Sequence, residues 1–212
     1  MRRGRPGRRA LTRIPSNVVV QGRRRILDDF LSVDEAEVSY ETYAGGMCGP
    51  VRRLSMERGD SVALLLHEPG EDGGEVILVE QFRFPTYGHE GGGWLVETIA
   101  GVIDDGEDAE TALRREALEE VGYRVGALEP IATYFASPGG SSERISIYFA
   151  TVGPEDRAAG QGGGLVAEHE DIRIVRVPLG DFFEKLDCGA YNDSKICVAG
   201  FWLRSRLRPP AP

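Results

Sequence analysis

Residues 101–123 read GVIDDGEDAETALRREALEEVGY, and the interpretation of the whole chain begins with them. Three acidic side chains, Glu116, Glu119 and Glu120, are spaced so that they share one face of a helix. Each i,i+4 pair of like charges costs a helix roughly 0.2–0.5 kcal/mol. The face is therefore either a solvated acidic surface or a set of carboxylates for a hard cation such as Mg²⁺, which prefers oxygen ligands.

The flanking residues predict a helix that begins near residue 107 and ends before Gly122. Glu107 and Asp108 place negative charge at the start of the helix, where its dipole favours them. Gly122 suits the left-handed conformation that stops many helices. Apolar residues recur at a spacing of four and predict a buried stripe, formed by Leu113, Ala117 and Val121.

This stretch resembles the Nudix box. The family pattern is Gly, five residues, Glu, seven residues, Arg-Glu, two residues, Glu-Glu, one residue, Gly and an apolar residue. The eight fixed positions are all filled, by Gly101, Glu107, Arg115, Glu116, Glu119, Glu120, Gly122 and Tyr123. The resemblance implies a Nudix-type α/β/α sandwich that binds Mg²⁺, or Mn²⁺ in its place, and acts on a diphosphate.

The resemblance also assigns roles to residues of the box. The expected metal ligands are the carbonyl of Ala100 and the side chains of Glu116, Glu119 and Glu120. Arg115 is expected to pair with the carboxylates and orient them, with Glu107 in a supporting role. Glu120 and Arg115 are thereby counted among the catalytic residues.

A Gly-rich segment beyond the box indicates where a general base is carried. Pro138 stands sixteen residues after Gly122, close to a proline associated with the ADP-ribose branch of the family. Residues 138–143 are similar to the mobile loop that carries a glutamate base in that branch, which implies Glu143 as the base. Pro138 and Gly139 would shape the loop around the substrate. The alternative for Glu143 is an exposed loop acid.

Further substrate contacts are implied by segments on either side of the box. Arg83 resembles an arginine that binds the diphosphate in this branch, and a guanidinium suits bidentate phosphate contact. The alternative is a surface arginine on a strand. Glu97 and Gly101 complete the expected substrate-binding residues. Segments 168–172 and 192–196 also resemble ADP-ribose and GDP-mannose pyrophosphatases.

Length and composition exclude several other classes of protein. The chain has 212 residues, which suits one domain with a small appended one. A net charge of −9 does not favour nucleic-acid binding. No apolar run approaches the ~20 residues that a membrane span needs. The three cysteines lack metal-site spacing, and an odd number argues against a disulfide framework. We therefore expect a cytoplasmic protein with no nucleic-acid or membrane partner.

The chain is expected to have four parts: a disordered basic tail (1–13), an N-terminal β-sheet (14–57), the catalytic domain (58–207) and a frayed tail (208–212). Alternating runs at 17–20, 26–31 and 37–43 predict a three-stranded antiparallel sheet. Alone, such a sheet is marginally stable, so it should pack on the main domain or on a second subunit. The resemblance implies a homodimer through this sheet. It also implies an aromatic residue at the nucleobase, chosen from Phe30, Tyr40 and Tyr43.

The main domain alternates strands with few helices. Apolar or alternating runs predict strands at 61–67, 75–81, 94–99, 123–127, 130–135, 144–152 and 171–177. Helices are expected over the box, at 179–186 and at 194–207. Residues 153–164 are Gly-rich and are interpreted as a flexible surface loop. The mixture independently favours an α/β sandwich.

These expectations converge on a Mg²⁺-dependent enzyme that splits a nucleoside diphosphate sugar. With ADP-ribose the products would be AMP and ribose 5-phosphate, and with GDP-mannose they would be GMP and mannose 1-phosphate. One alternative is a Nudix enzyme for nucleoside triphosphates. Another is a non-catalytic sensor of nucleotide sugars, against which the intact box argues.

Overall fold

The structure is a computed structural model that describes residues 14–207. The chain forms two compact units. One unit runs as far as Arg58 and includes Ser137–Ser142, and the other contains Gly59–Ala136 and the chain from Glu143 onward. Both predicted tails, 1–13 and 208–212, lie outside the described residues.

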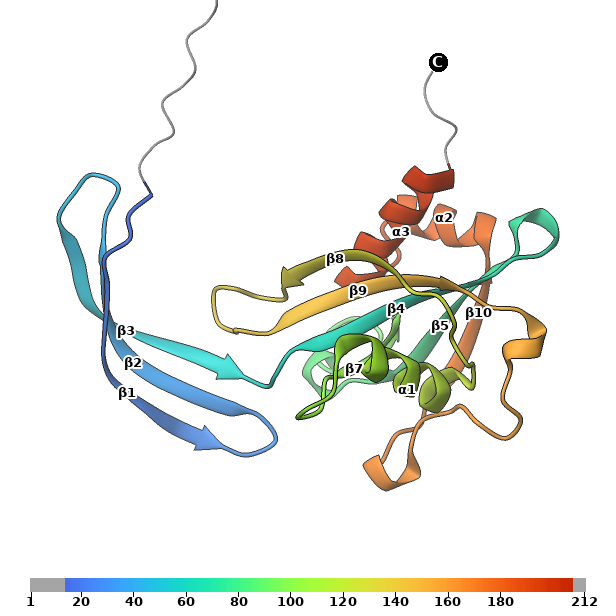
Figure 1. Cartoon of the computed structure of the whole chain (residues 1–212), viewed down its shortest axis with the longest axis horizontal. Helices are drawn as coiled ribbons and strands as arrows, with labels where there is room; N and C mark the ends of the chain where they lie inside the picture. The colour runs from blue at the N-terminus through green and yellow to red at the C-terminus, as the bar shows by residue number, and fades with distance from the viewer. Residues whose placement is uncertain (1–13, 208–212) are drawn as a thin grey trace, which may run out of the picture. The chain divides into compact units, whose positions relative to one another are not determined.

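The N-terminal unit is a three-stranded antiparallel sheet in the order β1-β2-β3 (Figure 1). Its strands are β1 (Val18–Asp28), β2 (Ser32–Glu41) and β3 (Met47–Glu57). The predicted sheet is confirmed, and the runs at 17–20 and 37–43 overlap β1 and β2, but the expected middle strand is wrong. The run at 26–31 crosses the turn between β1 and β2, and β3 lies beyond the last run.

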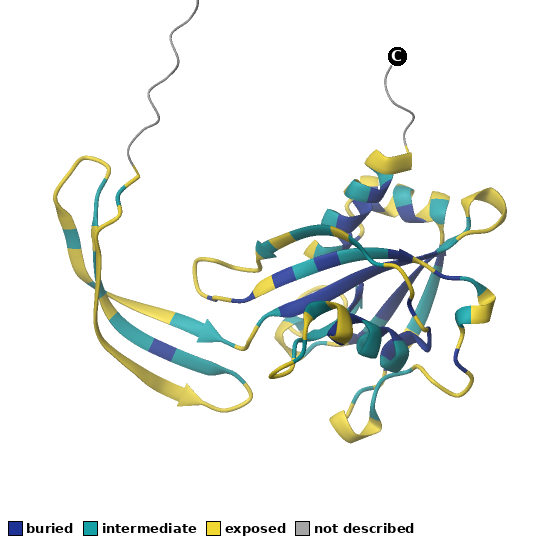
Figure 2. Cartoon of the chain, in the orientation of Figure 1, coloured by how far each residue is buried: buried dark blue, intermediate teal, exposed yellow. Residues whose placement is uncertain are grey.

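Ion pairs explain why the alternating pattern misplaced these strands. β1 is exposed along its whole length (Figure 2), so no buried face imposes a period of two. Its arginines instead pair with carboxylates of β2. Arg23 Nη2 lies 2.6 Å from Asp34, and Arg24 Nη2 lies 2.9 Å from Glu35. Arg52 of β3 joins Glu35 from the other side at 2.5 Å.

The larger unit is built on a seven-stranded sheet. Five strands follow the order β10-β5-β4-β9-β8, while β6 pairs with β5 and β7 pairs with β4. β4 and β9 are parallel, and the other pairs are antiparallel. The strands are β4 (Ser61–Glu68), β5 (Glu75–Phe82), β6 (Trp94–Glu97), β7 (Ile99–Val102), β8 (Glu129–Phe135), β9 (Arg144–Thr151) and β10 (Arg173–Pro178).

Helices cover both faces of this sheet (Figure 1). Helix α1 (Ala109–Val121) packs with one buried cluster, around Leu64, Ile77 and Leu113. Helices α2 (Leu179–Asp187) and α3 (Ser194–Leu207) share the other cluster, around Leu65, Phe182 and Ile196. Four short 3-10 helices lie in loops, at Glu71–Gly73, Phe84–Thr86, Pro154–Asp156 and Val166–Glu168. The expected α/β/α sandwich is confirmed.

Two predicted strands differ from the structure. The run at 94–99 divides at Thr98 into β6 and β7, so Gly101, the first residue of the box, belongs to a strand. The run at 123–127 is not a strand and forms only an isolated bridge between Tyr123 and Arg157. Tyr123 and Val125 are buried in the α1 cluster, which produces alternation without strand pairing.

The Gly-rich loop at 153–164 makes defined contacts with the end of α1. The backbone amides of Gly163 and Gly164 donate to the carbonyls of Glu120 and Glu119 at 2.9 and 3.0 Å, and Ala158 donates to Gly122 at 2.8 Å. These bonds satisfy carbonyls that a helix end leaves unpaired. The segment is therefore a surface loop, as expected, and these bonds tie it to the end of α1.

Two further features agree with the composition. All three cysteines are free thiols. Among residues 14–207, no helix is long and apolar enough to span a membrane.

Candidate active site

Local signals at its two ends place helix α1. The Asp108 carboxylate accepts hydrogen bonds from the amides of Glu110 and Thr111, each at 3.0 Å, and caps the first turn. Gly122 ends the helix in the left-handed region, with φ at 72°. Between them, Leu113 and Ala117 are fully buried against the sheet, so the intervening acids lie along the edge of the buried stripe.

Arg115 is the centre of the acidic cluster. Its guanidinium donates to both oxygens of Glu107, at 3.2 and 3.0 Å. It also reaches Glu116 at 2.7 Å and Glu119 at 3.2 Å, and the carbonyl of Val102 at 3.2 Å. Arg115 thus brings together three of the expected acids, Glu107, Glu116 and Glu119, and neutralises part of their charge.

Glu120 is the most deeply buried of the acids. One of its oxygens accepts a hydrogen bond from the amide of Ala100 at 3.1 Å. Burial, with a further contribution from the neighbouring Glu116 carboxylate, raises the pKa of Glu120 well above its usual value. Burial also raises the pKa of Glu116, although Arg115 opposes that shift. Two desolvated carboxylates this close are stabilised by a cation.

The Glu116 carboxylate occupies the space that a side chain at position 101 would need. A Cβ at this position would collide with the Glu116 side chain, so the glycine lets that carboxylate lie against β7. Ala100, whose carbonyl is an expected ligand, is the preceding residue of the same strand. A backbone carbonyl and glutamate oxygens form the hard donor set that suits Mg²⁺.

The acidic side chains of the box do not converge on one point at which a metal ion could lie. No group of three or more His, Cys, Asp or Glu side chains in residues 14–207 could hold a metal ion without rearrangement. Arg115 accounts for this, because it engages the oxygens of Glu107, Glu116 and Glu119. The donor chemistry fits a divalent cation, and a bound cation would compete with Arg115 for the same oxygens.

The structure adds one carboxylate that sequence reasoning missed. Glu170 is close enough that its charge helps to raise the pKa of both Glu116 and Glu120. It is held by the amide of Leu165, which donates to it at 2.9 Å. The sequence signal was the resemblance of residues 168–172 to related pyrophosphatases. The contacts of the 153–164 loop with α1, together with the burial of Ile172 in the α1 cluster, bring this segment to the box.

Arg83 and Glu97 lie together beside the acidic cluster. Arg83 Nε donates to Glu97 at 2.7 Å, and the Arg83 side chain is 42% exposed. The charge of Arg83 lowers the pKa of Glu120, in opposition to burial, so the guanidinium is within electrostatic reach of the box. An exposed guanidinium near carboxylates that could hold a metal is suited to bind a diphosphate.

Glu143 is not an exposed loop acid. It is buried, and its Oε1 accepts a hydrogen bond from the Ser61 hydroxyl at 2.6 Å. Pro138 and Gly139 lie in an exposed turn of the N-terminal unit. In that unit, the carbonyl of Gly140 accepts from the amide of Met56 at 2.8 Å, and the Ser142 hydroxyl donates to Glu57.

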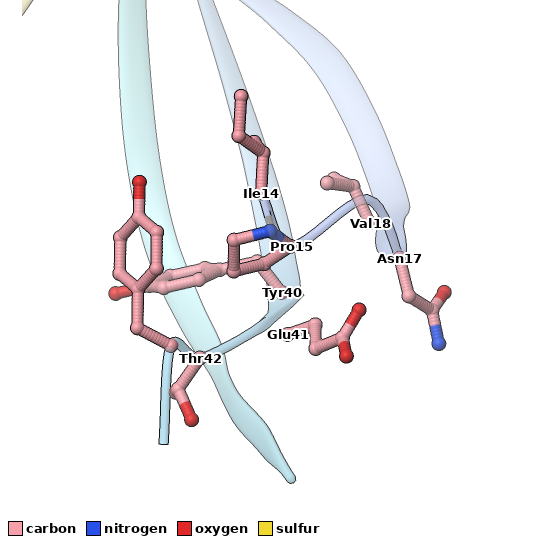
Figure 3. Close-up of a pocket in the computed structure, with 8 residues that line it drawn as sticks. Ile14, Pro15, Asn17, Val18, Tyr40, Glu41 and Thr42 are labelled. Carbon is pink, nitrogen blue, oxygen red and sulfur yellow. The ribbon is translucent and has the colours of Figure 1, made fainter. Parts of the chain in front are cut away.

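Two of the three candidate aromatics border a pocket in the N-terminal unit. Tyr40 and Tyr43 line a cavity of about 330 Å³ together with Pro15 and Val18 (Figure 3). Phe30, by contrast, is 90% exposed in the turn after β1. The geometry of this unit therefore favours the two tyrosines over Phe30 as a site for a flat ring.

Comparison with known proteins agrees with the site. The model of the NUDIX domain family matches residues 57–196. A protein of Escherichia coli K12 named ADP-ribose pyrophosphatase is 36% identical over 190 residues, which cover 89% of this chain and 88% of its own. One of that name from Haemophilus influenzae is 32% identical over 193 residues, 89% of this chain and 86% of its own.

A second group of relatives carries a different name. A protein of Pectobacterium atrosepticum named GDP-mannose pyrophosphatase is 38% identical over 156 residues, which cover 73% of this chain and 77% of its own. Members of the family typically depend on a metal ion, in keeping with the donor set around Glu120. With the complete box on helix α1 and these matches along most of its length, the chain belongs to the Nudix family.

Proposed function

We propose that this chain is a Mg²⁺-dependent pyrophosphatase of nucleoside diphosphate sugars, with ADP-ribose or GDP-mannose as its substrate. The observation that carries the proposal is the desolvated pair Glu116 and Glu120 beside Arg115, in a complete Nudix box. The relatives named as ADP-ribose and GDP-mannose pyrophosphatases support the substrate class.

Some of the site residues would bind the cation, and others would bind the substrate. Ala100, Glu116, Glu119 and Glu120 would hold the metal, which when bound neutralises phosphate oxygens and lowers the pKa of a water ligand. Arg83 would bind the diphosphate. Arg115 would orient the carboxylates, and its bonds to Glu116 and Glu119 support this role.

Two carboxylates are candidates to accept the proton of the attacking water. Glu143 is the base that the loop resemblance implies, and its hydrogen bond from Ser61 fixes the direction of its carboxylate. Glu170 is supported by its electrostatic contact with Glu116 and Glu120. We retain Glu143 as the base and treat Glu170 as the alternative that the structure introduces.

A substrate panel tests the function. The purified protein with Mg²⁺ is given ADP-ribose, GDP-mannose, other nucleotide sugars and nucleoside triphosphates, and a coupled phosphatase releases phosphate from the products. We expect turnover of a nucleotide sugar to exceed that of any triphosphate. A preference for triphosphates would replace the proposal with the alternative Nudix activity, and tight binding without turnover would indicate a sensor.

Matched variants identify the base. Replacing a general base is expected to lower kcat by about 100-fold or more. We expect this loss in Glu143→Gln, with a smaller loss in Glu170→Gln. Glu184→Gln, on an exposed position of helix α2, serves as the control. The reverse order of the two losses would assign the base to Glu170.

The N-terminal sheet is proposed to join two copies of the chain into a homodimer. Its β1 strand exposes Val18, Val20 and Leu27, and a three-stranded sheet with an exposed apolar face is marginal alone. Tyr40 and Tyr43 are the proposed nucleobase contacts, because they line the cavity of this unit.

A further inference from the structure

A buried charge cluster lies where helix α3 begins. The Lys195 ammonium donates to Asp193 at 2.9 Å and to Glu97 at 3.3 Å. The side chains of Lys195, Asp193 and Glu97 are only 14%, 4% and 8% exposed. Buried charges are costly unless they are paired, so these three groups depend on one another.

The choice of lysine is informative because the chain has almost none. Of its 25 basic residues, only Lys185 and Lys195 are lysines. An ammonium is compact and has three donors on a flexible stem, so it can serve two carboxylates in a confined space. Although burial opposes it, the charges of Asp193 and Glu97 raise the pKa of Lys195, which keeps the ammonium charged.

Glu97 connects this cluster to the candidate substrate arginine. Its two oxygens have different partners: Oε2 accepts from Arg83 at 2.7 Å, and Oε1 accepts from Lys195 at 3.3 Å. A carboxylate held at both oxygens cannot turn about its terminal bond. The direction of the Arg83 guanidinium is therefore set by Glu97, and the direction of Glu97 is set in part by Lys195.

Asp193 fixes the same strand junction from a second side. One of its oxygens accepts from the Thr98 amide at 3.2 Å, and the other accepts from Lys195 Nζ and the Lys195 amide. Thr98 lies between β6, which carries Glu97, and β7, which carries Ala100. Asp193 and Lys195 thus hold the segment from which both the arginine partner and the backbone ligand arise.

We propose that Lys195 and Asp193 are positioning residues, which hold Glu97 so that Arg83 is directed at the diphosphate of the substrate. The inference rests on the proposed function, in which Arg83 binds that diphosphate. Neither residue touches the reacting atoms, so both act on the affinity for substrate more than on the chemical step.

The first test is Lys195→Met, which keeps the length of the side chain and removes its charge. We expect KM for the nucleotide sugar to rise by about tenfold or more, the cost seen when a residue that orients a metal ligand by a hydrogen bond is removed. We expect kcat to change by less than about threefold, because the lost interaction serves binding equally in ground and transition states. Lys185→Met, at the exposed lysine of α2, should leave both constants unchanged. A fall in kcat with KM unchanged would overturn the proposal.

A double-mutant cycle separates positioning from general damage to the fold. If Lys195 acts through Glu97 and Arg83, Lys195→Met should add less than about twofold to the KM of Arg83→Ala. Independent effects that multiply would show that Lys195 is merely structural. If circular dichroism shows that Lys195→Met folds poorly, the double variant Asp193→Asn/Lys195→Met is tested in its place. This double variant removes one charge of each sign, so it leaves the net charge of the cluster unchanged.

The same proteins distinguish failure of the inference from failure of the proposed function. If the wild type hydrolyses no nucleotide sugar, the proposed function is wrong. The cycle is then measured as the affinity for inorganic diphosphate by titration calorimetry with Mg²⁺. Weaker binding by Lys195→Met only when Arg83 is present supports positioning, and equal weakening in both backgrounds rejects it.

Discussion

Glu120 is a carboxylate that loses its contact with water while a second carboxylate stands beside it. Because its pKa is raised, the ionised form destabilises the folded state at neutral pH, relative to an unfolded chain in which this glutamate titrates normally. A bound cation would reverse this effect. In the proposed function, Glu120 therefore lowers the stability of the metal-free protein and provides a ligand for the metal.

Glu120→Gln separates these two properties. The amide oxygen can still accept the Ala100 hydrogen bond, but the buried charge is gone. We expect a higher melting temperature for the metal-free variant at pH 7, measured by calorimetry. We also expect kcat to fall by at least about 100-fold, because a metal supplies several kcal/mol of charge stabilisation.

Glu110→Gln is the matched control for this change. Glu110 lies in the first turn of the same helix and pairs with the exposed Arg114 at 3.1 Å. The Glu110→Gln substitution should leave activity unchanged and alter the free energy of unfolding by less than about 0.5 kcal/mol. A Glu120→Gln variant that melts lower than the wild type would contradict the charge argument.

The elements of the larger unit are joined by a polar network away from the box. Tyr123 donates to Glu68 at 2.7 Å, and Arg176 of β10 donates to Glu68 at 2.6 Å and to Tyr123 at 2.9 Å. Burial raises the pKa of Glu68, but these two donors outweigh burial and the pKa is lowered. The ionised Glu68 thus stabilises the packing of β4, β10 and the segment after α1.

This network predicts a pH dependence of stability. A carboxyl with a lowered pKa stabilises the fold above its unfolded pKa, near 4.5, and loses that contribution as the pH falls through its folded pKa. Glu68→Gln should therefore cost about 1–2 kcal/mol at pH 7 and progressively less below pH about 4.5. Urea unfolding at several pH values measures the difference. A constant difference would exclude the carboxylate as its source.

The end of α1 offers a second prediction at this scale. Gly122 has a positive φ, which a residue with a side chain rarely adopts. A Cβ at this position would also lie 2.5 Å from the Gln161 carbonyl oxygen. Gly122→Ala should cost more than about 1 kcal/mol in thermal or urea unfolding. Gly106→Ala has a similar positive φ but no neighbour within 4 Å, so it isolates the backbone cost from the clash. Equal losses would mean that the 153–164 loop yields freely.

Local signals explain which elements could be predicted. Helix α1 could be predicted from its N-cap Asp108, its stop at Gly122 and the apolar stripe that includes Leu113. Strand β4 could be predicted because it is a nearly continuous apolar run. Only the start of β1 could be placed, because its arginines are stabilised by partners on β2 and leave no periodic pattern. The alternation of apolar and polar residues at 123–127 reflects the burial of Tyr123 and Val125 and not the pairing of a strand.

The site was predictable where its residues are close in sequence. The spacing of the box places Arg115 and the acids on one helix without further information. Lys195 and Glu97 are separated by 98 positions, and no local pattern relates them. Glu170 likewise reaches the box through contacts distant in sequence, which are hydrogen bonds from the loop to the end of α1 and the burial of Ile172.

On the scale of the whole molecule, the proposed homodimer gives a measurable mass. One chain has a mass of 23.2 kDa, so sedimentation should find a particle of about twice that value. Val20→Lys places a charge on the exposed apolar face of β1 and should shift the equilibrium toward single chains. Gln21→Lys, on the opposite face of the strand, is the control. A wild type that sediments as a single chain would exclude the dimer.

Arg115 has a consequence for handling the protein. Since its guanidinium already bridges three of the glutamates, stripping divalent ions with a chelator leaves the acids with a counter-charge of their own. The ion-free chain should remain folded through purification and storage, dormant until magnesium is restored. Small zinc domains, which collapse when their ion is withdrawn, lack such a built-in substitute.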